Sequence, residues 1–144
     1  MSQGDQAISV VDLHKRFGQM EVLKGISLTA REGDVIAIIG GSGSGKSTFL
    51  RCINMLELPT SGSVTIHGET IAMKGDGRGG QVPAQRRQVE RIRAQLGMVF
   101  QSFNLWQHMT VLQNVIEAPV HVLGMRRDEA IATAEALLRR VGLY

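Results

Sequence analysis

One short run of the sequence combines glycines, hydroxyl groups and a lysine at a spacing suited to phosphate binding. The run is Gly40-Gly41-Ser42-Gly43-Ser44-Gly45-Lys46-Ser47-Thr48, of the form G-x-x-x-x-G-K-S. Its glycines allow positive φ angles, so that successive N–H groups can point into one hollow. The lysine offers a cation to the β- and γ-phosphates, and the serine that follows offers a hydroxyl to Mg²⁺.

The residues on either side of this run predict the elements that must position it. Residues 35–39 are continuously apolar, as in a strand covered on both faces. Residues 49–53 continue as a helix, whose first N–H groups and positive end favour a phosphate at its start. Strand, glycine-rich turn and helix together predict that the chain binds a nucleoside triphosphate.

Composition sets the limits for this interpretation. The chain has 144 residues, 43% of them hydrophobic and 20% charged, which suits about one globular domain. A net charge of +3, with basic and acidic residues interspersed, gives no indication of nucleic-acid binding. The single cysteine, Cys52, excludes an internal disulfide, fits a reducing compartment and is expected to be a packed thiol. The histidines lack metal-ligand spacing.

Neither a signal peptide nor an apolar run of membrane-spanning length is visible in the sequence. A cytoplasmic protein is therefore expected, with any membrane role reached through a partner. Short runs of strand character are predicted on both sides of the glycine-rich run, at residues 8–13, 26–30, 64–67, 70–71 and 97–100. Residues 74–83 are polar and glycine-dense, which predicts a mobile surface loop.

The second half of the sequence is predicted to be mainly helical. Residues 84–96 form a basic helix, whose arginines are expected on a solvated face. Thr110 and Gln113 make a capping box, so a helix begins near Val111, and Pro119 ends or kinks it. Asp128 opens a further helix that ends at Gly142. Its apolar face is expected to comprise Ile131, Ala134, Leu137, Leu138 and Val141.

Several stretches together resemble the ATP-binding subunit of ABC importers, closest to the polar and basic amino-acid group typified by the histidine permease. The stretches are residues 12–18, 22–25, 45–54 and 104–111, with Met98-Val99-Phe100-Gln101-Ser102-Phe103-Asn104-Leu105. The resemblance implies an α/β P-loop NTPase fold with a RecA-like core and an antiparallel β subdomain. Residues 1–102 would belong to the nucleotide-binding core, and residues 103–144 would start a helical subdomain.

The family pattern also implies roles for individual residues. Phe17 takes the aromatic position that stacks on adenine, and residues 40–48 take the phosphate positions. Gln101 takes the position of the catalytic glutamine that contacts Mg²⁺ and the attacking water, so Ser47 and Gln101 would be the metal contacts. Residues 103–125 resemble the region that meets the membrane subunit. A contact patch is expected there from Phe103, Leu105, Trp106 and Met109.

The function implied by the resemblance is ATP binding and hydrolysis that drive import of polar or basic amino acids. The implied partners are a second ATP-binding subunit, transmembrane permease subunits and, indirectly, a solute-binding protein, at the cytoplasmic face of the inner membrane. The Leu-Ser-Gly-Gly-Gln signature, the apolar strand ending in Asp-Glu that carries the catalytic glutamate, and the switch histidine are not matched. We therefore expect the N-terminal part of such a subunit, which binds ATP without turnover and is poorly stable alone.

Other classes of protein remain as alternatives. A GTPase would need an Asn/Thr-Lys-x-Asp element, which the sequence lacks, and residues 78–93 are a poor candidate for the arginine-bearing lid of a small-molecule kinase. A non-transport ABC ATPase is disfavoured by residues 104–111, which resemble the importers. A nucleotide-binding module without turnover is the remaining alternative. A preference for ATP over GTP, and copurification of membrane subunits, would separate these classes.

Overall fold

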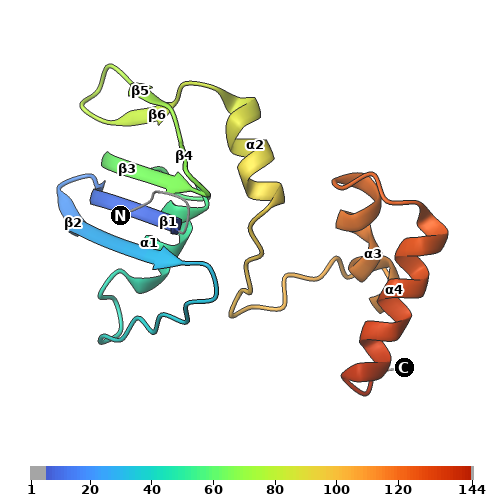
Figure 1. Cartoon of the computed structure of the whole chain (residues 1–144). Helices are drawn as coiled ribbons and strands as arrows, with labels where there is room; N and C mark the ends of the chain where they lie inside the picture. The colour runs from blue at the N-terminus through green and yellow to red at the C-terminus, as the bar shows by residue number, and fades with distance from the viewer. Residues whose placement is uncertain (1–5, 144) are drawn as a thin grey trace. The chain divides into compact units, whose positions relative to one another are not determined.

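The computed structural model describes residues 6–143. Two compact units share the chain, a first unit of Met1–Leu96 and a second unit of Gly97–Tyr144 (Figure 1). The first unit holds every described strand and the helices α1 and α2, and the second holds the helices α3 and α4. Each unit has its own hydrophobic cluster.

An antiparallel sheet forms the body of the first unit. Its strands lie in the order β2-β1-β3-β4. The bounds are β1 Gln6–Phe17, β2 Met20–Arg31, β3 Ser61–Ile66 and β4 Glu69–Thr70. Phe17 pairs with Met20 across a two-residue turn in which Gly18 has φ 57°, so the longest hairpin ends at Phe17. The strands predicted at 8–13, 26–30 and 64–67 all lie in this sheet, and residue 70 ends its short edge strand.

Residues 74–83 form a second hairpin rather than the irregular loop expected from their composition. Strands β5 Met73–Gly75 and β6 Gln81–Pro83 pair antiparallel. The Asp76 carboxylate closes the turn, because its Oδ1 accepts the N–H groups of Arg78 at 2.7 Å and Gly80 at 2.9 Å. The same hydrogen bonds hold the pKa of Asp76 below its usual value. A polar, glycine-rich run can therefore be ordered by one carboxylate.

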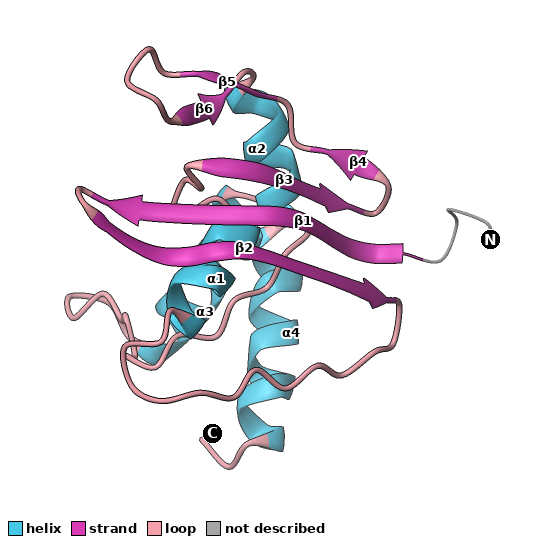
Figure 2. Cartoon of the chain, turned by 90° about the vertical axis from the view of Figure 1, so that its left-hand side faces the viewer, coloured by secondary structure: helices cyan, strands magenta, loops and turns pink. Residues whose placement is uncertain are grey.

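Two helices cover one face of the large sheet (Figure 2). They are α1 Lys46–Ile53 and α2 Arg86–Ala94, both predicted from the sequence. Their buried side chains meet those of the sheet in one cluster, which includes Val10, Leu13, Leu23, Val64, Ile66, Phe49, Cys52, Ile53, Val89 and Ile92. Full burial of each large apolar side chain contributes about 1.5–3 kcal/mol, so this layer fixes the start of α1 against the sheet.

Two arginines of α2 make hydrogen bonds or ion pairs with neighbouring segments of the first unit. Arg93 donates from Nε to the carbonyl of Asn54 at 3.0 Å, and from its NH2 group to the carbonyl of Met55. Arg91 pairs with Glu69 of β4. The helix is therefore fastened to the segment after α1 and to the sheet edge. Arg91 and Arg93 are nevertheless exposed, as the sequence predicts, and make these contacts in addition to facing solvent.

The second unit is a pair of helices, and the sequence correctly predicts where the first of them begins. Helix α3, Val111–His121, has the complete capping box, since Thr110 Oγ1 accepts the Gln113 N–H at 3.2 Å and Gln113 Oε1 accepts the Thr110 N–H at 2.8 Å. Pro119 lies inside α3, two residues before its end. Helix α4, Arg127–Arg140, buries Ala130, Ala134 and Leu138. The expected face was partly wrong, because Leu137 and Val141 are exposed.

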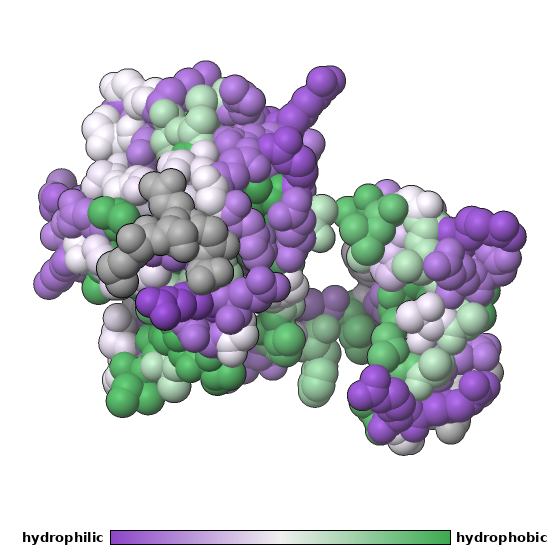
Figure 3. All heavy atoms as spheres, in the orientation of Figure 1, coloured by the Kyte–Doolittle hydropathy of each residue, from purple (hydrophilic) through white to green (hydrophobic). Residues whose placement is uncertain are grey.

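Two expected strands are not formed. Residues 35–39 and 97–100 have no regular secondary structure, and Val35, Ile39 and Val99 are 97%, 92% and 98% exposed. A strand needs a neighbour for its backbone groups, and within residues 6–143 both sheets are built without these segments. Figure 3 shows apolar atoms along the lower edge of the first unit, where the chain runs between β2 and α1. Among residues 6–143, no helix has the length and apolar character to cross a bilayer.

Candidate phosphate-binding site

The glycine-rich run forms a loop that leads directly into α1. Ser44 donates its backbone N–H to the Gly41 carbonyl at 3.3 Å, and Phe49 donates to the Gly45 carbonyl at 2.8 Å to start the helix. Gly43 and Gly45 have φ of 77° and 93°, which favours glycine at both positions. The predicted turn and helix are thus present, although the strand expected before them is not.

Close packing against β2 is a second reason for glycine at position 45. A Cβ there would lie 3.0 Å from Val22 Cγ1, 3.1 Å from Leu23 Cδ2 and 3.2 Å from the Val22 carbonyl oxygen. The start of α1 therefore lies directly against the hairpin that also carries Phe17. A side chain at Gly45 would push the loop away from that hairpin.

The Lys46 ammonium lies within the curl of the loop. Its Nζ donates to the carbonyls of Gly40 at 2.8 Å and Gly41 at 2.6 Å, and to Ser44 Oγ at 3.3 Å. A Cβ on Gly40 would come within 2.8 Å of Ser44 Oγ, so a side chain there would require the Ser44 hydroxyl to move. A cation held among glycines at a helix start is a fit for a triphosphate, because phosphate oxygens can replace the carbonyls as its acceptors.

The first turn of α1 carries the other predicted contacts of the loop. Ser47 is exposed and Thr48 half-buried, while Phe49, Cys52 and Ile53 on the opposite side are buried in the core. Burial of that side directs the Ser47 hydroxyl toward solvent at the start of the helix. An exposed hydroxyl beside a phosphate loop suits a hard cation such as Mg²⁺.

The structure groups some of the predicted site residues and not others. Phe17 ends β1, is 47% exposed and belongs to the same unit as the loop. Gln101 belongs to the second unit, where it is exposed in a segment without helix or strand. Phe103, Leu105 and Trp106 of the expected patch are 92%, 58% and 51% exposed, and Met109 is half-buried.

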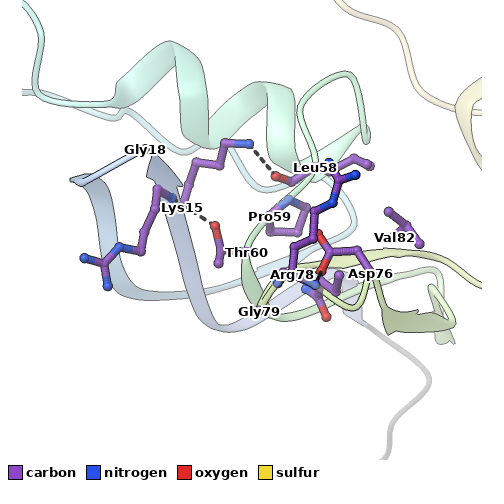
Figure 4. A pocket seen from close by; sticks show the side chains of 12 residues that line it. Lys15, Gly18, Leu58, Pro59, Thr60, Asp76, Arg78, Gly79 and Val82 are labelled. Carbon is purple, nitrogen blue, oxygen red and sulfur yellow. Dashed lines mark hydrogen bonds between the residues drawn. The ribbon is translucent and has the colours of Figure 1, made fainter.

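Lys15, which contacts the Phe17 ring, was missed by sequence reasoning. Its ammonium lies 4.6 Å from the centroid of the Phe17 ring. It also donates to the Leu58 carbonyl at 2.7 Å (Figure 4). It also pairs with Glu57 at 2.5 Å. A cavity of about 370 Å³ opens beside Lys15, between Thr60 and the β5–β6 turn at Arg78. The signal was available, because residues two apart on a strand share a face.

His14 of β1 and Glu21 of β2 shift each other's pKa values. His14 Nδ1 lies 2.9 Å from Glu21 Oε1, and its Nε2 lies 3.2 Å from Asp12 Oδ1. Hydrogen bonding to Glu21, with a smaller contribution from Asp12, raises the pKa of His14, and the same contact lowers the pKa of Glu21.

Burial raises the pKa of the Cys52 thiol to about 11, so Cys52 is a packed thiol, as expected.

The glycine-rich loop, the helix that follows it and the antiparallel sheet packed on that helix define a P-loop nucleotide-binding protein. The family model described as ABC transporter matches residues 23–144, and the chain belongs to that family. The resemblance found in the sequence is thereby confirmed.

Curated relatives cover nearly all of this chain. It is 57% identical over 136 residues to the arginine/ornithine transport ATP-binding protein AotP of Pseudomonas aeruginosa, covering 94% of this chain and 54% of that protein. It is 55% identical over 139 residues to the histidine/lysine/arginine/ornithine transport ATP-binding protein HisP of Escherichia coli, with coverage of 96% and 54%. The nopaline permease ATP-binding protein P of Agrobacterium fabrum is 56% identical, with coverage of 92% and 51%. The chain thus spans about half the length of these relatives.

Solved structures confirm the fold class. The chain matches cbiO1 of Clostridium perfringens, described as part of the ABC transporter complex cbiONQ, with a TM-score of 0.74 and 27% identity. That match covers 96% of this chain and 51% of the other. The dimeric bacterial ABC transporter cassette MJ0796 gives a TM-score of 0.75 and 31% identity, with coverage of 92% and 56%.

Proposed function

We propose that the chain is part of the ATP-binding subunit of an importer for polar and basic amino acids, in which ATP binding and hydrolysis drive transport. Nucleotide binding is supported by the position of the Lys46 ammonium, which is held inside a glycine loop at the start of α1. The substrate class is supported by the relatives, which are ATP-binding proteins of arginine/ornithine, histidine/lysine/arginine/ornithine and nopaline transport systems.

In this proposal the loop binds the triphosphate and the hairpin binds the base. Backbone N–H groups of residues 40–48 and the Lys46 ammonium take the phosphate oxygens. The Phe17 ring, half exposed at the end of β1, stacks on adenine. Ser47 and Gln101 are the proposed contacts of Mg²⁺, which when bound neutralises phosphate charge. Gln101 also orients the attacking water.

The proposed partners follow from the exposed surface of the second unit and from the relatives. Phe103, Leu105 and Trp106 expose a large apolar area, which suits contact with another protein. We assign these side chains to a transmembrane permease subunit, and place the protein at the cytoplasmic face of the inner membrane. A second ATP-binding subunit completes the assembly, as the dimeric MJ0796 cassette suggests, and a solute-binding protein acts indirectly.

The Lys46→Ala variant tests nucleotide binding. Loss of a charge-assisted hydrogen bond costs about 1.5–3 kcal/mol, so ATP affinity should fall by about ten- to a hundredfold, as measured by calorimetry with Mg²⁺. Lys24→Ala, at an exposed lysine of β2, is the matched control and should bind ATP normally. Unchanged ATP affinity in a folded Lys46→Ala protein would refute the site.

A further inference from the structure

The Lys15 side chain is largely buried, and its ammonium contacts three other residues. Its side chain is only 11% exposed. The Leu58 carbonyl accepts a hydrogen bond from its Nζ at 2.7 Å (Figure 4). Glu57 Oε1 lies 2.5 Å from the same nitrogen, so both partners belong to the segment after α1. A desolvated ammonium is costly without such partners, which makes this position well defined.

The segment that holds Lys15 is itself tied to the helix of the phosphate loop. The Glu57 N–H donates to the Arg51 carbonyl in the last turn of α1 at 3.0 Å. Helix α1 begins at Lys46, the residue assigned to phosphate binding. A short path therefore runs from the phosphate loop through α1 and Glu57 to the Lys15 ammonium.

The same ammonium lies over one face of the Phe17 ring. Lys15 and Phe17 are two residues apart on β1, and the nitrogen is 4.6 Å from the ring centroid. A cation within about 6 Å of an aromatic centroid is attracted by the ring. Phe17 as a whole is still 47% exposed, so part of the residue remains open to a ligand.

We infer that Lys15 is a positioning residue for the nucleotide base, fixing the Phe17 ring at a set place relative to the phosphate loop. This inference rests on the proposed stacking role of Phe17. The Glu57 carboxylate fixes the ammonium, and the ammonium fixes the ring. Lys15 itself contacts the ring rather than the nucleotide, so its effect should appear only with ligands that carry a base.

The test compares ATP with ribose 5′-triphosphate, which lacks the base, on the purified protein. Lys15→Met keeps the apolar stem and removes the charge, and it should weaken ATP binding about three- to tenfold while leaving ribose triphosphate unchanged. Lys24→Met, an exposed lysine on the neighbouring strand, is the matched control and should change neither affinity. Lys15→Arg should restore ATP binding to within about twofold, because it keeps the cation.

Two further variants separate this inference from the proposed function. Phe17→Ala should weaken ATP binding selectively, and the double variant Lys15→Met/Phe17→Ala should weaken it no further, because Lys15 acts through the ring. Selective weakening by Phe17→Ala without any by Lys15→Met would overturn the positioning role alone. Equal weakening of both ligands by Lys15→Met would show a merely structural residue and also overturn it. A Phe17→Ala protein without base selectivity would refute the stacking role itself.

Glu57→Gln provides an independent variant if Lys15→Met does not fold. The amide keeps the shape of the carboxylate and removes the charge that holds the ammonium. A smaller, ATP-selective loss of affinity is expected. Equal affinity of Glu57→Gln and the unsubstituted protein for ATP would contradict the path from α1 to the ring.

Discussion

At the scale of single residues, His14 makes the hairpin that carries Phe17 sensitive to pH. The imidazole lies between Glu21 and Asp12, and Glu21 is also near Arg16 and Lys24. A raised pKa of His14 stabilises the fold fully below 6.5, and this contribution is lost as pH rises through the folded pKa. The lowered pKa of Glu21 acts in the opposite sense, with stabilisation present above 4.5 and lost as pH falls. The pair therefore stabilises most between these two values.

The corresponding prediction concerns the free energy of unfolding as a function of pH. Between pH 6 and 8 the free energy of unfolding should fall for the unsubstituted protein and vary less for His14→Gln, as measured by urea unfolding. The cause is that glutamine keeps hydrogen bonding but does not titrate. His67→Gln, at the exposed turn between β3 and β4, is the matched control and should retain the pH dependence. Identical pH profiles for all three proteins would show that His14 does not cause the pH dependence of stability.

Residue-level prediction worked where a side chain acts through its own sequence neighbours. The G-x-x-x-x-G-K-S run contains the loop, the cation and the helix start in nine consecutive residues, so its local geometry follows from the sequence. Lys15 was missed because two of its three partners, Glu57 and Leu58, are more than forty residues away in sequence. Only its contact with Phe17 could have been predicted from the sequence, because residues two apart on a strand lie on the same face.

At the scale of elements, the capping box is the feature whose removal has the clearest expected cost. Thr110→Ala removes the acceptor for the Gln113 N–H at the start of α3. Loss of an N-cap of this kind costs about 1 kcal/mol, so amide hydrogen exchange in α3 should accelerate about fivefold, while exchange in β1 and β3 stays unchanged. Thr110→Ser, which keeps the hydroxyl, should exchange at the original rate. Equal exchange in the alanine and serine variants would contradict the capping role.

Element prediction succeeded or failed according to where the stabilising partners lie. The start of α3 was predicted because the two residues of its capping box, Thr110 and Gln113, are only three positions apart in the sequence. Residues 35–39 and 97–100 have strand composition, but a strand is made by its neighbours, and the sheets of residues 6–143 do not include them. The β5–β6 hairpin was missed for the opposite reason. Its composition suggests a loop, while one side chain, Asp76, supplies the order.

At the scale of the whole molecule, the second unit offers a test of the proposed membrane partner. Gln107 lies next to Trp106 and is exposed. A cysteine at this position should form a cross-link with a transmembrane permease subunit in native membranes, because the apolar side chains around it are assigned to that contact. Gln95→Cys, exposed at the end of α2 in the first unit, is the comparison site and should give a weaker product. Cross-links confined to non-membrane proteins would count against the assignment.

Residues 35–39 of the first unit form an exposed apolar segment. Residues 35–39 are Val-Ile-Ala-Ile-Ile, with Val35 97% and Ile39 92% exposed, and no strand of residues 6–143 pairs with them. Unpaired backbone along a run of high β propensity is a template for strand addition from another chain. The small net charge of +3 gives little repulsion to oppose it. Association of copies through this segment is therefore expected.

Replacing both Val35 and Ile39 by lysine should suppress this association, because a charge at each end of the segment opposes stacking of identical strands. Light scattering of the 144-residue chain should fall, and the monomer fraction in sedimentation should rise. The matched control is Val122→Lys/Val141→Lys, which adds the same two charges at positions 67% exposed outside the segment. If the control suppresses association equally, net charge rather than residues 35–39 governs it. If neither variant changes the scattering, the segment is not the contact between copies.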